Sequence, residues 1–149
     1  MHFLRLKGLA LLLLLPALAL SAQTRERDTI PDQYKWNLAD IYPTNEAWTA
    51  AKQEFVAKVD KVGALKGTLA QSPASLLAAA ETITNLNKDF ARLYVYASMS
   101  SDQDTRNSTY QAMKQEMAQL GSTFSAAIAW SEPEILKMDA ATIDRYLAA

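Results

Sequence analysis

Apolar side chains recur at spacings of three and four residues along three long segments of the chain, the period of an α-helix with one buried face. The first segment begins near Thr44 or Asn45, whose side chains can accept hydrogen bonds from the free amides of a first turn, and ends at Gly63. On the face opposite the apolar stripe, Glu54 and Lys58 lie four residues apart in the order that favours an ion pair. The predicted buried stripe consists of Trp48, Ala51, Phe55, Val59 and Val62.

The second segment has the clearest helix start in the sequence. Ser72 can cap the helix, and Pro73 lies in the first turn, where its missing amide costs nothing. The apolar period continues to a polar turn predicted at residues 100–104. The predicted exposed face carries Glu81, Asn85, Lys88 and Arg92. The predicted buried stripe consists of Leu76, Ala80, Ile83, Leu86, Phe90, Leu93 or Tyr94, and Ala97.

The third segment follows Asp104, which is predicted to cap it, and its spacing is typical of a seam that packs at a shallow angle. Gly121 lies inside this segment at a predicted cost of about 1 kcal/mol relative to alanine. Pro133 is predicted to break the chain, and after Asp139 a fourth amphipathic stretch begins that is cut off at Ala149. The predicted apolar positions are Tyr110, Met113, Met117, Leu120, Phe124 and Ala127 in the third segment, and Ile143, Tyr146 and Leu147 in the fourth.

The predicted fold class is therefore all-α, an antiparallel array of three long helices plus the start of a fourth. Before the helices, residues 34–43 interleave apolar and polar side chains and are predicted to pack on the array as an irregular strap. Residues 23–33 are polar without a period and are predicted to form an extended arm. The array is expected to leave apolar surface for further protein to cover, because large aromatic side chains occur on several faces: Trp36, Trp48, Tyr96 and Trp130.

The N-terminus has the pattern of a secretory signal peptide. Arg5 and Lys7 precede an apolar stretch, Leu9 to Leu20, that ends in Ser21 and Ala22. A membrane anchor is the alternative, but the stretch is shorter than the roughly 20 residues that a spanning helix needs. The chain has no cysteine, so the lipoprotein route is closed. We therefore predict a signal peptide over 1–22, export to the periplasm or medium, and a helical domain over 34–149 that is incomplete at its C-terminus.

The charge and the residue inventory exclude several classes of function. Loss of residues 1–22 removes Arg5 and Lys7 but no acidic residue, so the net charge changes from −1 to −3. The charges are scattered, so neither nucleic acid nor an anionic membrane is a predicted partner. The single histidine, His2, lies in the predicted signal peptide. The mature region therefore lacks an H-E-x-x-H zinc motif and any Cys/His or Ser/His pair, and no catalytic, cofactor-binding or metal-binding residue is predicted in it.

Two acidic clusters are candidate sites of chemistry. Asp102 and Asp104 could open a calcium loop, but the sixth position is Asn107 instead of glycine and the twelfth is Met113 instead of glutamate, which favours a turn and a helix cap. Glu132 and Glu134 could serve as general acid and base. Both flank Pro133 before a helical turn, which favours solvated acids in the first turn of a helix.

Three further patterns favour ordinary structural roles. Asn107-Ser108-Thr109 matches an N-glycosylation acceptor but is interpreted as plain helix surface. Two pairs at helical spacing could suggest a bound ligand, but such pairs on an apolar face are typical of a core. These pairs are Met113 with Met117, and Tyr94 with Tyr96.

Several blocks resemble a known family. Residues 34–43, followed by Glu46-Ala47-Trp48, resemble the opening of the mature region of oligoendopeptidase F, a member of the thimet oligopeptidase group of zinc metallopeptidases. Three later blocks fit the same N-terminal region in the same order: Leu65 to Leu69 together with Leu76-Leu77, then Leu93 to Ala97, and Asp102 to Thr105.

The resemblance implies a longer and almost entirely helical enzyme, whose N-terminal region helps to wall a channel that admits short peptides. It also implies a zinc ion held by the two histidines of H-E-x-x-H and a downstream glutamate, with the motif's own glutamate acting as general base. All of these residues would lie beyond Ala149.

Two hypotheses follow. In the first, the chain is the N-terminal helical domain of an exported oligopeptidase, inactive alone, whose partners are short peptide substrates and the remainder of the peptidase chain. In the second, it is a self-sufficient exported helical protein that binds a partner or small ligand and does not catalyse.

Overall fold

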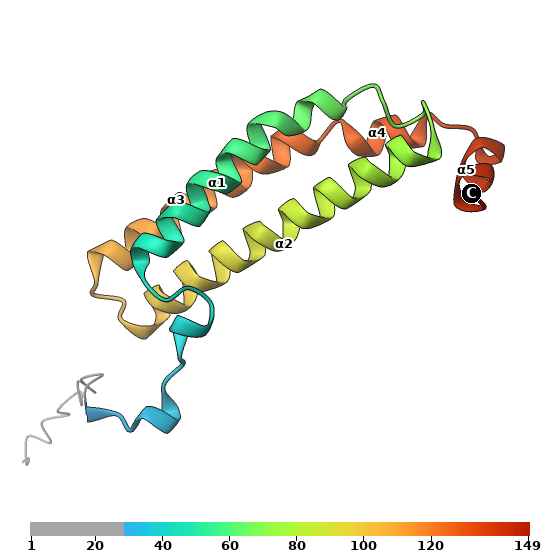
Figure 1. Ribbon diagram of the computed structural model, residues 1–149. Coiled ribbons are helices and arrows are strands. Elements are labelled where there is room, and N and C mark those ends of the chain that lie inside the picture. Colours follow the sequence, from blue (N-terminus) through green and yellow to red (C-terminus); the bar gives the residue numbers. More distant parts are fainter. Residues whose placement is uncertain (1–28) are drawn as a thin grey trace, which may run out of the picture.

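The computed structural model describes residues 29–149, and this part of the chain is helical without a strand. Three long helices follow one another in the chain, and each runs antiparallel to the one before it (Figure 1). Two short helices follow at one end of the array. The prediction of an all-α antiparallel array is confirmed. The predicted signal peptide, residues 1–22, lies outside the described residues. The helices are α1 (Asn45–Val62), α2 (Pro73–Gln103), α3 (Ser108–Ile128), α4 (Ser131–Leu136) and α5 (Ala140–Leu147).

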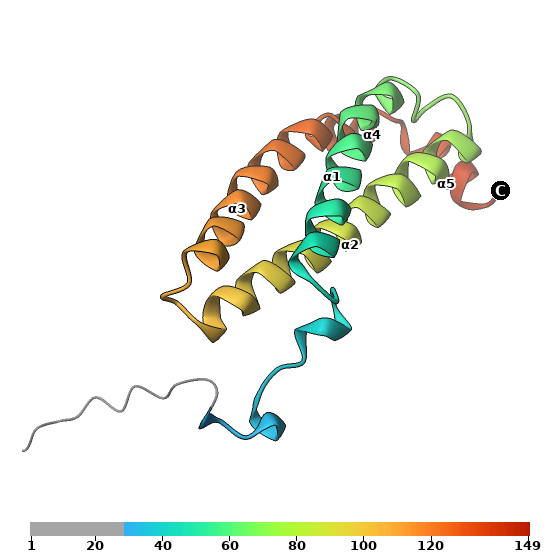
Figure 2. The ribbon, with the colours of Figure 1, turned by 60° about the vertical axis from the view of Figure 1, so that its left-hand side comes forward.

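The helix α2 is the centre of the array, because both α1 and α3 pack along it (Figures 1 and 2). Its start is the predicted one: the Ser72 side chain accepts a hydrogen bond from the Ser75 amide at 3.0 Å, and Pro73 is the first helical residue. At the start of α1, Thr44 is the cap and accepts from the Ala47 amide at 3.2 Å. The alternative between Thr44 and Asn45 is therefore settled in favour of Thr44.

Three phenylalanine rings, one from each long helix, meet in the middle of the core. The ring of Phe55 lies 5.3 Å from that of Phe124 and 5.9 Å from that of Phe90, measured between centroids. Phe90 and Phe124 are also 5.9 Å apart. Nearby, the buried Trp48 ring donates its Nε1–H to the Leu93 carbonyl of α2 at 3.0 Å. The predicted stripes of the first and third helices are thus confirmed as core.

Along α2 the structure decides the open choice between Leu93 and Tyr94 and corrects the predicted stripe at Ala80. Leu93 is the core residue of its pair, because it is 1% exposed whereas Tyr94 is 44% exposed. Ala79 is buried, and Ala80, which was predicted to be buried, is exposed. Because α2 supports one helix on each of two sides, its buried surface is wider than a single stripe.

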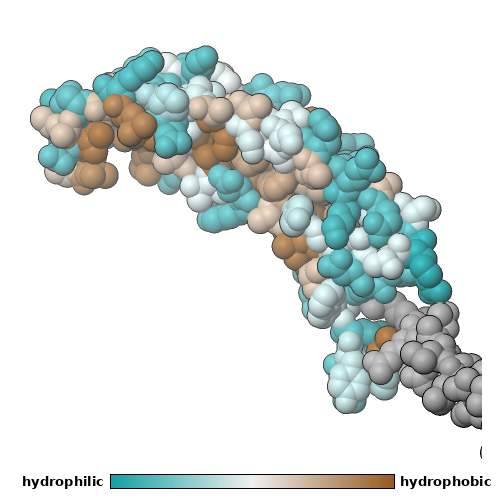
Figure 3. Space-filling view, turned by 180° about the vertical axis from the view of Figure 1, so that it is seen from behind, coloured by the Kyte–Doolittle hydropathy of each residue, from teal (hydrophilic) through white to brown (hydrophobic). Residues whose placement is uncertain are grey.

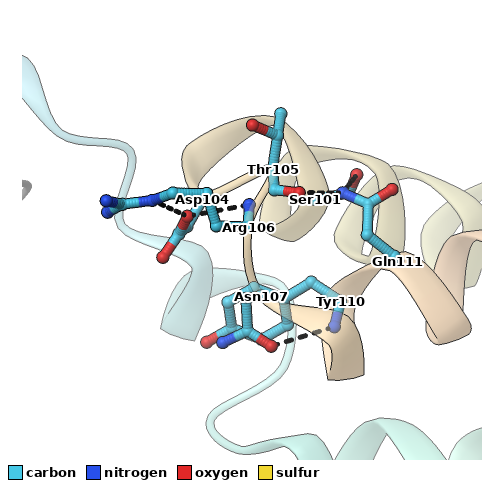
Figure 4. A network of polar contacts seen from close by, with 7 residues as sticks. All are labelled: Ser101, Asp104, Thr105, Arg106, Asn107, Tyr110 and Gln111. Atoms are coloured by element: carbon cyan, nitrogen blue, oxygen red, sulfur yellow. Dashed lines mark hydrogen bonds and ion pairs between the residues drawn. The ribbon is translucent and has the colours of Figure 1, made fainter. Parts of the chain in front are cut away.

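The turn predicted at residues 100–104 is wrong, since α2 continues to Gln103. Ser100 and Ser101 are buried inside the helix, and the Ser101 hydroxyl accepts a hydrogen bond from Gln111 of α3 at 2.9 Å (Figure 4). The polar side chains of this segment are typical of a loop, but Gln111 gives the Ser101 hydroxyl a hydrogen-bond partner inside the fold. Polar side chains therefore did not end the helix here.

The predicted cap of the third helix is also wrong. Asn107 is the cap, and its side-chain oxygen accepts from the Thr109 amide at 3.0 Å. The same oxygen accepts from the Tyr110 amide at 3.3 Å (Figure 4). Asp104 instead accepts from the amide and the side chain of Arg106 within the connecting turn. These hydrogen bonds lower the pKa of the Asp104 carboxyl.

The strap predicted over residues 34–43 packs on the array and contains two short 3-10 turns, η2 (Asp32–Tyr34) and η3 (Leu38–Asp40). The first turn begins inside the arm that was predicted over 23–33, of which only 29–33 is described. Tyr42 is buried against Tyr96, with ring centroids 5.4 Å apart, and the Arg92 guanidinium lies 4.8 Å above its ring. Burial raises the pKa of the Tyr42 hydroxyl. The strap is therefore anchored to α2.

The ion pair predicted between Glu54 and Lys58 is replaced by a pair between helices. The Lys58 ammonium bonds Asp89 of α2 at 2.7 Å. On the other side of α1, Lys52 bonds Glu116 of α3. Both lysines thus link α1 to a neighbouring helix, since interhelical carboxylates lie within their reach.

The glycine inside α3 lies where another helix comes close. A Cβ atom built at Gly121 would lie 2.9 Å from Cζ of Phe90, whereas one built at Gly63, the C-cap of α1, would meet no atom within 4 Å. Packing therefore explains why a poor helix former occupies position 121: a larger side chain would contact the Phe90 ring. The glycine allows the central ring of the core to approach α3.

We expect Gly121→Ala to lower the free energy of unfolding, because overpacking costs about 1–3 kcal/mol and outweighs the roughly 1 kcal/mol gained in helix propensity. Gly63→Ala is the matched control, and a gain of about 0.4–1 kcal/mol is expected there because alanine restricts the unfolded chain. Urea unfolding followed by circular dichroism measures both. Equal stabilisation by the two substitutions would show that Phe90 yields without cost.

Candidate functional site

A hollow of about 740 Å³ lies where α4 and α5 meet the connection between α1 and α2. It is found at the end of the array that carries the C-terminus (Figure 1). Residues from three separate stretches line it, including Lys66 and Gly67 before α2, Trp130 and Glu134 around α4, and Arg145 and Tyr146 on α5. Titratable and aromatic side chains gather around this cavity.

Glu134 joins α4 to the connection between α1 and α2. One carboxylate oxygen accepts the Gly67 amide at 2.8 Å and the other accepts the Leu69 amide at 2.9 Å. Gly67 has a φ of 81°, in the left-handed region that favours glycine, and this conformation belongs to the turn that presents the two amides. Glu134 therefore works as a clamp on the backbone.

Glu132 and Glu134 do not form the acid/base pair that was the alternative to two solvated acids. Residues two apart on a helix do not face each other, and both oxygens of Glu134 already accept backbone amides. The prediction of two solvated acids holds for Glu132, which is exposed, and is wrong for Glu134. Pro133 lies inside α4, whose first turn it shares with both glutamates. The chain break predicted at Pro133 falls instead at Ala129 and Trp130, between α3 and α4.

The helix α5 is attached through its cap and one tyrosine. Asp139 is the cap, as predicted, and accepts from both the amide and the hydroxyl of Thr142 at 2.8 Å. These hydrogen bonds, the hydroxyl first, lower the pKa of Asp139, so the cap acts at neutral pH and is lost as the pH falls through that lowered value. The Tyr146 hydroxyl donates to the Ala70 carbonyl at 2.8 Å.

The charges around the hollow are unbalanced. Its two carboxylates, Glu134 and Asp139, accept hydrogen bonds from helix and turn groups. Within residues 29–149, no carboxylate forms an ion pair with Lys66 or Lys137. Trp130 also contributes a buried Nε1–H without an acceptor in the described part. The hollow is thus suited to contact acceptor groups of another molecule or segment.

The other candidate residues of the sequence have structural partners. Asp102 pairs with Lys114 at 3.3 Å and Asp104 with Arg106, so the two carboxylates do not converge as a calcium loop would require. Among the described residues, no group of three or more side chains could hold a metal ion. The Asn107 side chain of the glycosylation pattern is used as the cap of α3.

The two pairs interpreted as core have different outcomes. Met113 and Met117 are buried, and so is Tyr96, as predicted. Tyr94 was predicted to lie in the core with Tyr96 and instead is half exposed, stacked on Phe90 at a centroid distance of 6.1 Å. The hollow itself had no sequence signal apart from Gly67, because its parts lie more than 60 residues apart in the chain.

No protein-family model matches this chain, but individual relatives do. Group B oligopeptidase PepB of Streptococcus agalactiae is 31% identical over 121 residues, which are 81% of this chain and 20% of that protein. The plasmid oligoendopeptidase F of Lactococcus lactis subsp. cremoris is 33% identical over 124 residues, 83% of this chain and 21% of that protein. Over this region, the chain belongs to the oligoendopeptidase F family.

Solved structures agree with the family. The oligoendopeptidase-F of Enterococcus faecium matches 70% of this chain with a TM-score of 0.65 and 31% identity. A peptidase described as putative from Chlamydophila abortus matches 85% of the chain with a TM-score of 0.68 and 26% identity. The chain spans about one fifth of the length of the oligoendopeptidase F relatives that it matches. The resemblance seen in the sequence is therefore confirmed, together with the helical fold.

Within residues 29–149, no helix is long and apolar enough to span a membrane.

We expect Glu134→Gln to lower the free energy of unfolding by roughly 1–2 kcal/mol, because the amide side chain can accept only one of the two backbone hydrogen bonds. Glu132→Gln, two residues away and exposed, is the matched control and is expected to change stability by less than about 0.5 kcal/mol. Thermal unfolding measures the difference, and amide exchange at Gly67 and Leu69 locates it. Unchanged exchange at both amides in the Glu134 variant would contradict the clamp.

Proposed function

We propose that this chain is the N-terminal helical part of an exported zinc metallo-oligopeptidase that hydrolyses short peptides. The observation that carries the proposal is the match to proteins named as oligopeptidases over about four fifths of the chain, at 31–33% identity. The helical array also matches that of a solved oligoendopeptidase-F.

In this proposal the helical array forms part of the wall of the substrate channel and contributes no catalytic residue. A helix of 31 residues such as α2 is about 46 Å long, and two other helices brace it along its length. Such a rigid array suits one side of a channel that admits short peptides and excludes folded proteins. The described residues do not fit a zinc site, so the zinc ligands and the general base are proposed to belong to the remainder of the enzyme.

The chain is proposed to be inactive alone, because it holds neither an H-E-x-x-H motif nor any histidine after residue 2. Reading the coding sequence past Ala149 is expected to give an in-frame H-E-x-x-H. An intact stop codon followed by unrelated sequence would contradict the enzyme and favour a helical binding protein.

The full-length protein is expected to cleave short quenched-fluorescent peptides and to lose at least about 100-fold in rate when a chelator removes the metal or when the glutamate of the motif is replaced by glutamine. Residues 23–149 alone are expected to show no cleavage above background. A folded protein substrate is the control and is expected to remain intact. Chelator-resistant cleavage would contradict a zinc enzyme.

Export is proposed from the pattern of residues 1–22 alone. Mass spectrometry of the protein isolated from its native host is expected to give a mature N-terminus at Ala22 or Gln23, since either Ser21 or Ala22 can occupy the position before the cut. A protein that retains Met1 and stays in the cytoplasm would overturn the export proposal and leave the peptidase proposal intact.

A further inference from the structure

Three apolar side chains of α4 and α5 are exposed. Leu136 and Leu147 are 76% and 79% exposed, and Ile135 is also exposed. Neither helix contains a buried residue, whereas each of the three long helices buries three or more. Figure 3 shows hydrophobic side chains gathered at the end of the molecule that α4 and α5 form. An apolar cluster of this kind marks a contact surface.

The short helix α5 also lacks the packing that normally maintains a helix of its size. It has eight residues, well below the roughly 12–15 at which isolated helices become stable in water. The Asp139 cap stabilises α5 from within, and the Tyr146 hydroxyl bonds the helix to Ala70. Its amphipathic sequence nevertheless places Ile143 and Leu147 one turn apart, as for a helix with a buried side.

Other exposed apolar residues differ from this cluster. Leu77 on α2 is 60% exposed, but it belongs to a helix that buries seven residues elsewhere. Isolated exposed leucines are common on protein surfaces and need no partner. The end formed by α4 and α5 combines exposed leucines on two adjacent helices with the hollow between them.

We infer that α4, α5 and the rim residues Lys66 and Lys137, here called the α4–α5 surface, form the contact through which the remaining polypeptide of the oligopeptidase packs on this chain. The inference rests on the function proposed above. The relatives are about five times longer than the matched region, so the family has ample chain to cover this end.

The charge of the rim specifies the covering segment further. Lys66 and Lys137 lack carboxylate partners in the described part, while Glu134 and Asp139 are occupied by backbone and cap hydrogen bonds. A segment that fits the surface therefore carries aliphatic side chains over Leu136 and Leu147, flanked by carboxylates at the lysines.

Amide exchange in the full-length protein tests the contact. Residues 140–147 are expected to exchange at least about tenfold more slowly in the full-length protein than in the chain that ends at Ala149, because a covered helix opens less often. Residues 86–93 in the centre of α2 are the internal control and are expected to exchange alike in both. Equal exchange of residues 140–147 in the two proteins would overturn the inference.

Matched substitutions in the full-length protein locate the contact. Leu147→Asp is expected to remove the added protection of α5, whereas Leu77→Asp, equally polar and on an exposed site of α2, is expected to leave it unchanged. Lys137→Glu is expected to reduce the protection about threefold or more at low salt, with Lys88→Glu as its control. Equal effects of each variant and its control would overturn the assignment to this surface.

The outcome distinguishes the two proposals. A full-length protein that cleaves peptides but leaves residues 140–147 unprotected overturns the contact alone. One that protects them but does not cleave peptides retains the contact and overturns the peptidase. Protection that rises with concentration in the chain ending at Ala149 identifies a second copy as the occupant and overturns the inference.

Discussion

The contact of α1 and α3 with α2 through three phenylalanine rings is the interaction on which the rest of the structure depends. Phe55, Phe90 and Phe124 each come from a different helix, and their centroids lie within 5.9 Å of one another. Without a disulfide or a metal group in the described part, apolar packing of this kind must stabilise the array. Gly121 belongs to the same arrangement, because the Phe90 ring occupies the place of its side chain.

Polar side chains hold the two ends of the array in position. The Glu134 carboxylate holds two amides of the turn before α2, and Tyr146 holds the Ala70 carbonyl. At the other end, Arg92 and Tyr96 anchor the strap and the start of α1. The charged side chains best placed for chemistry are thereby used for capping and for helix contacts. These contacts fix the two ends of the array relative to its long helices.

The long helices and their buried faces could be predicted from the sequence because they depend on local periodicity. The caps at Ser72 and Asp139, the stripes of α1 and α3, and the family resemblance all came from residues close together in the chain. The errors occurred where a distant partner changed the local preference. Ser100 and Ser101 look like a turn in the sequence, but Gln111 of the next helix donates a hydrogen bond to Ser101 and the segment stays helical. Lys58 looks paired with Glu54, but Asp89 of α2 lies 2.7 Å from its ammonium.

The helical class and the family to which the chain belongs could both be read from the amino-acid sequence. Only the tertiary structure decided that Leu93 and not Tyr94 is buried, that Glu134 clamps the turn at Gly67, and that α4 and α5 leave their leucines uncovered. The physical reason is that helix period is a property of neighbours in the chain. Burial, hydrogen-bond partners and uncovered surface depend on segments that meet only in the folded protein.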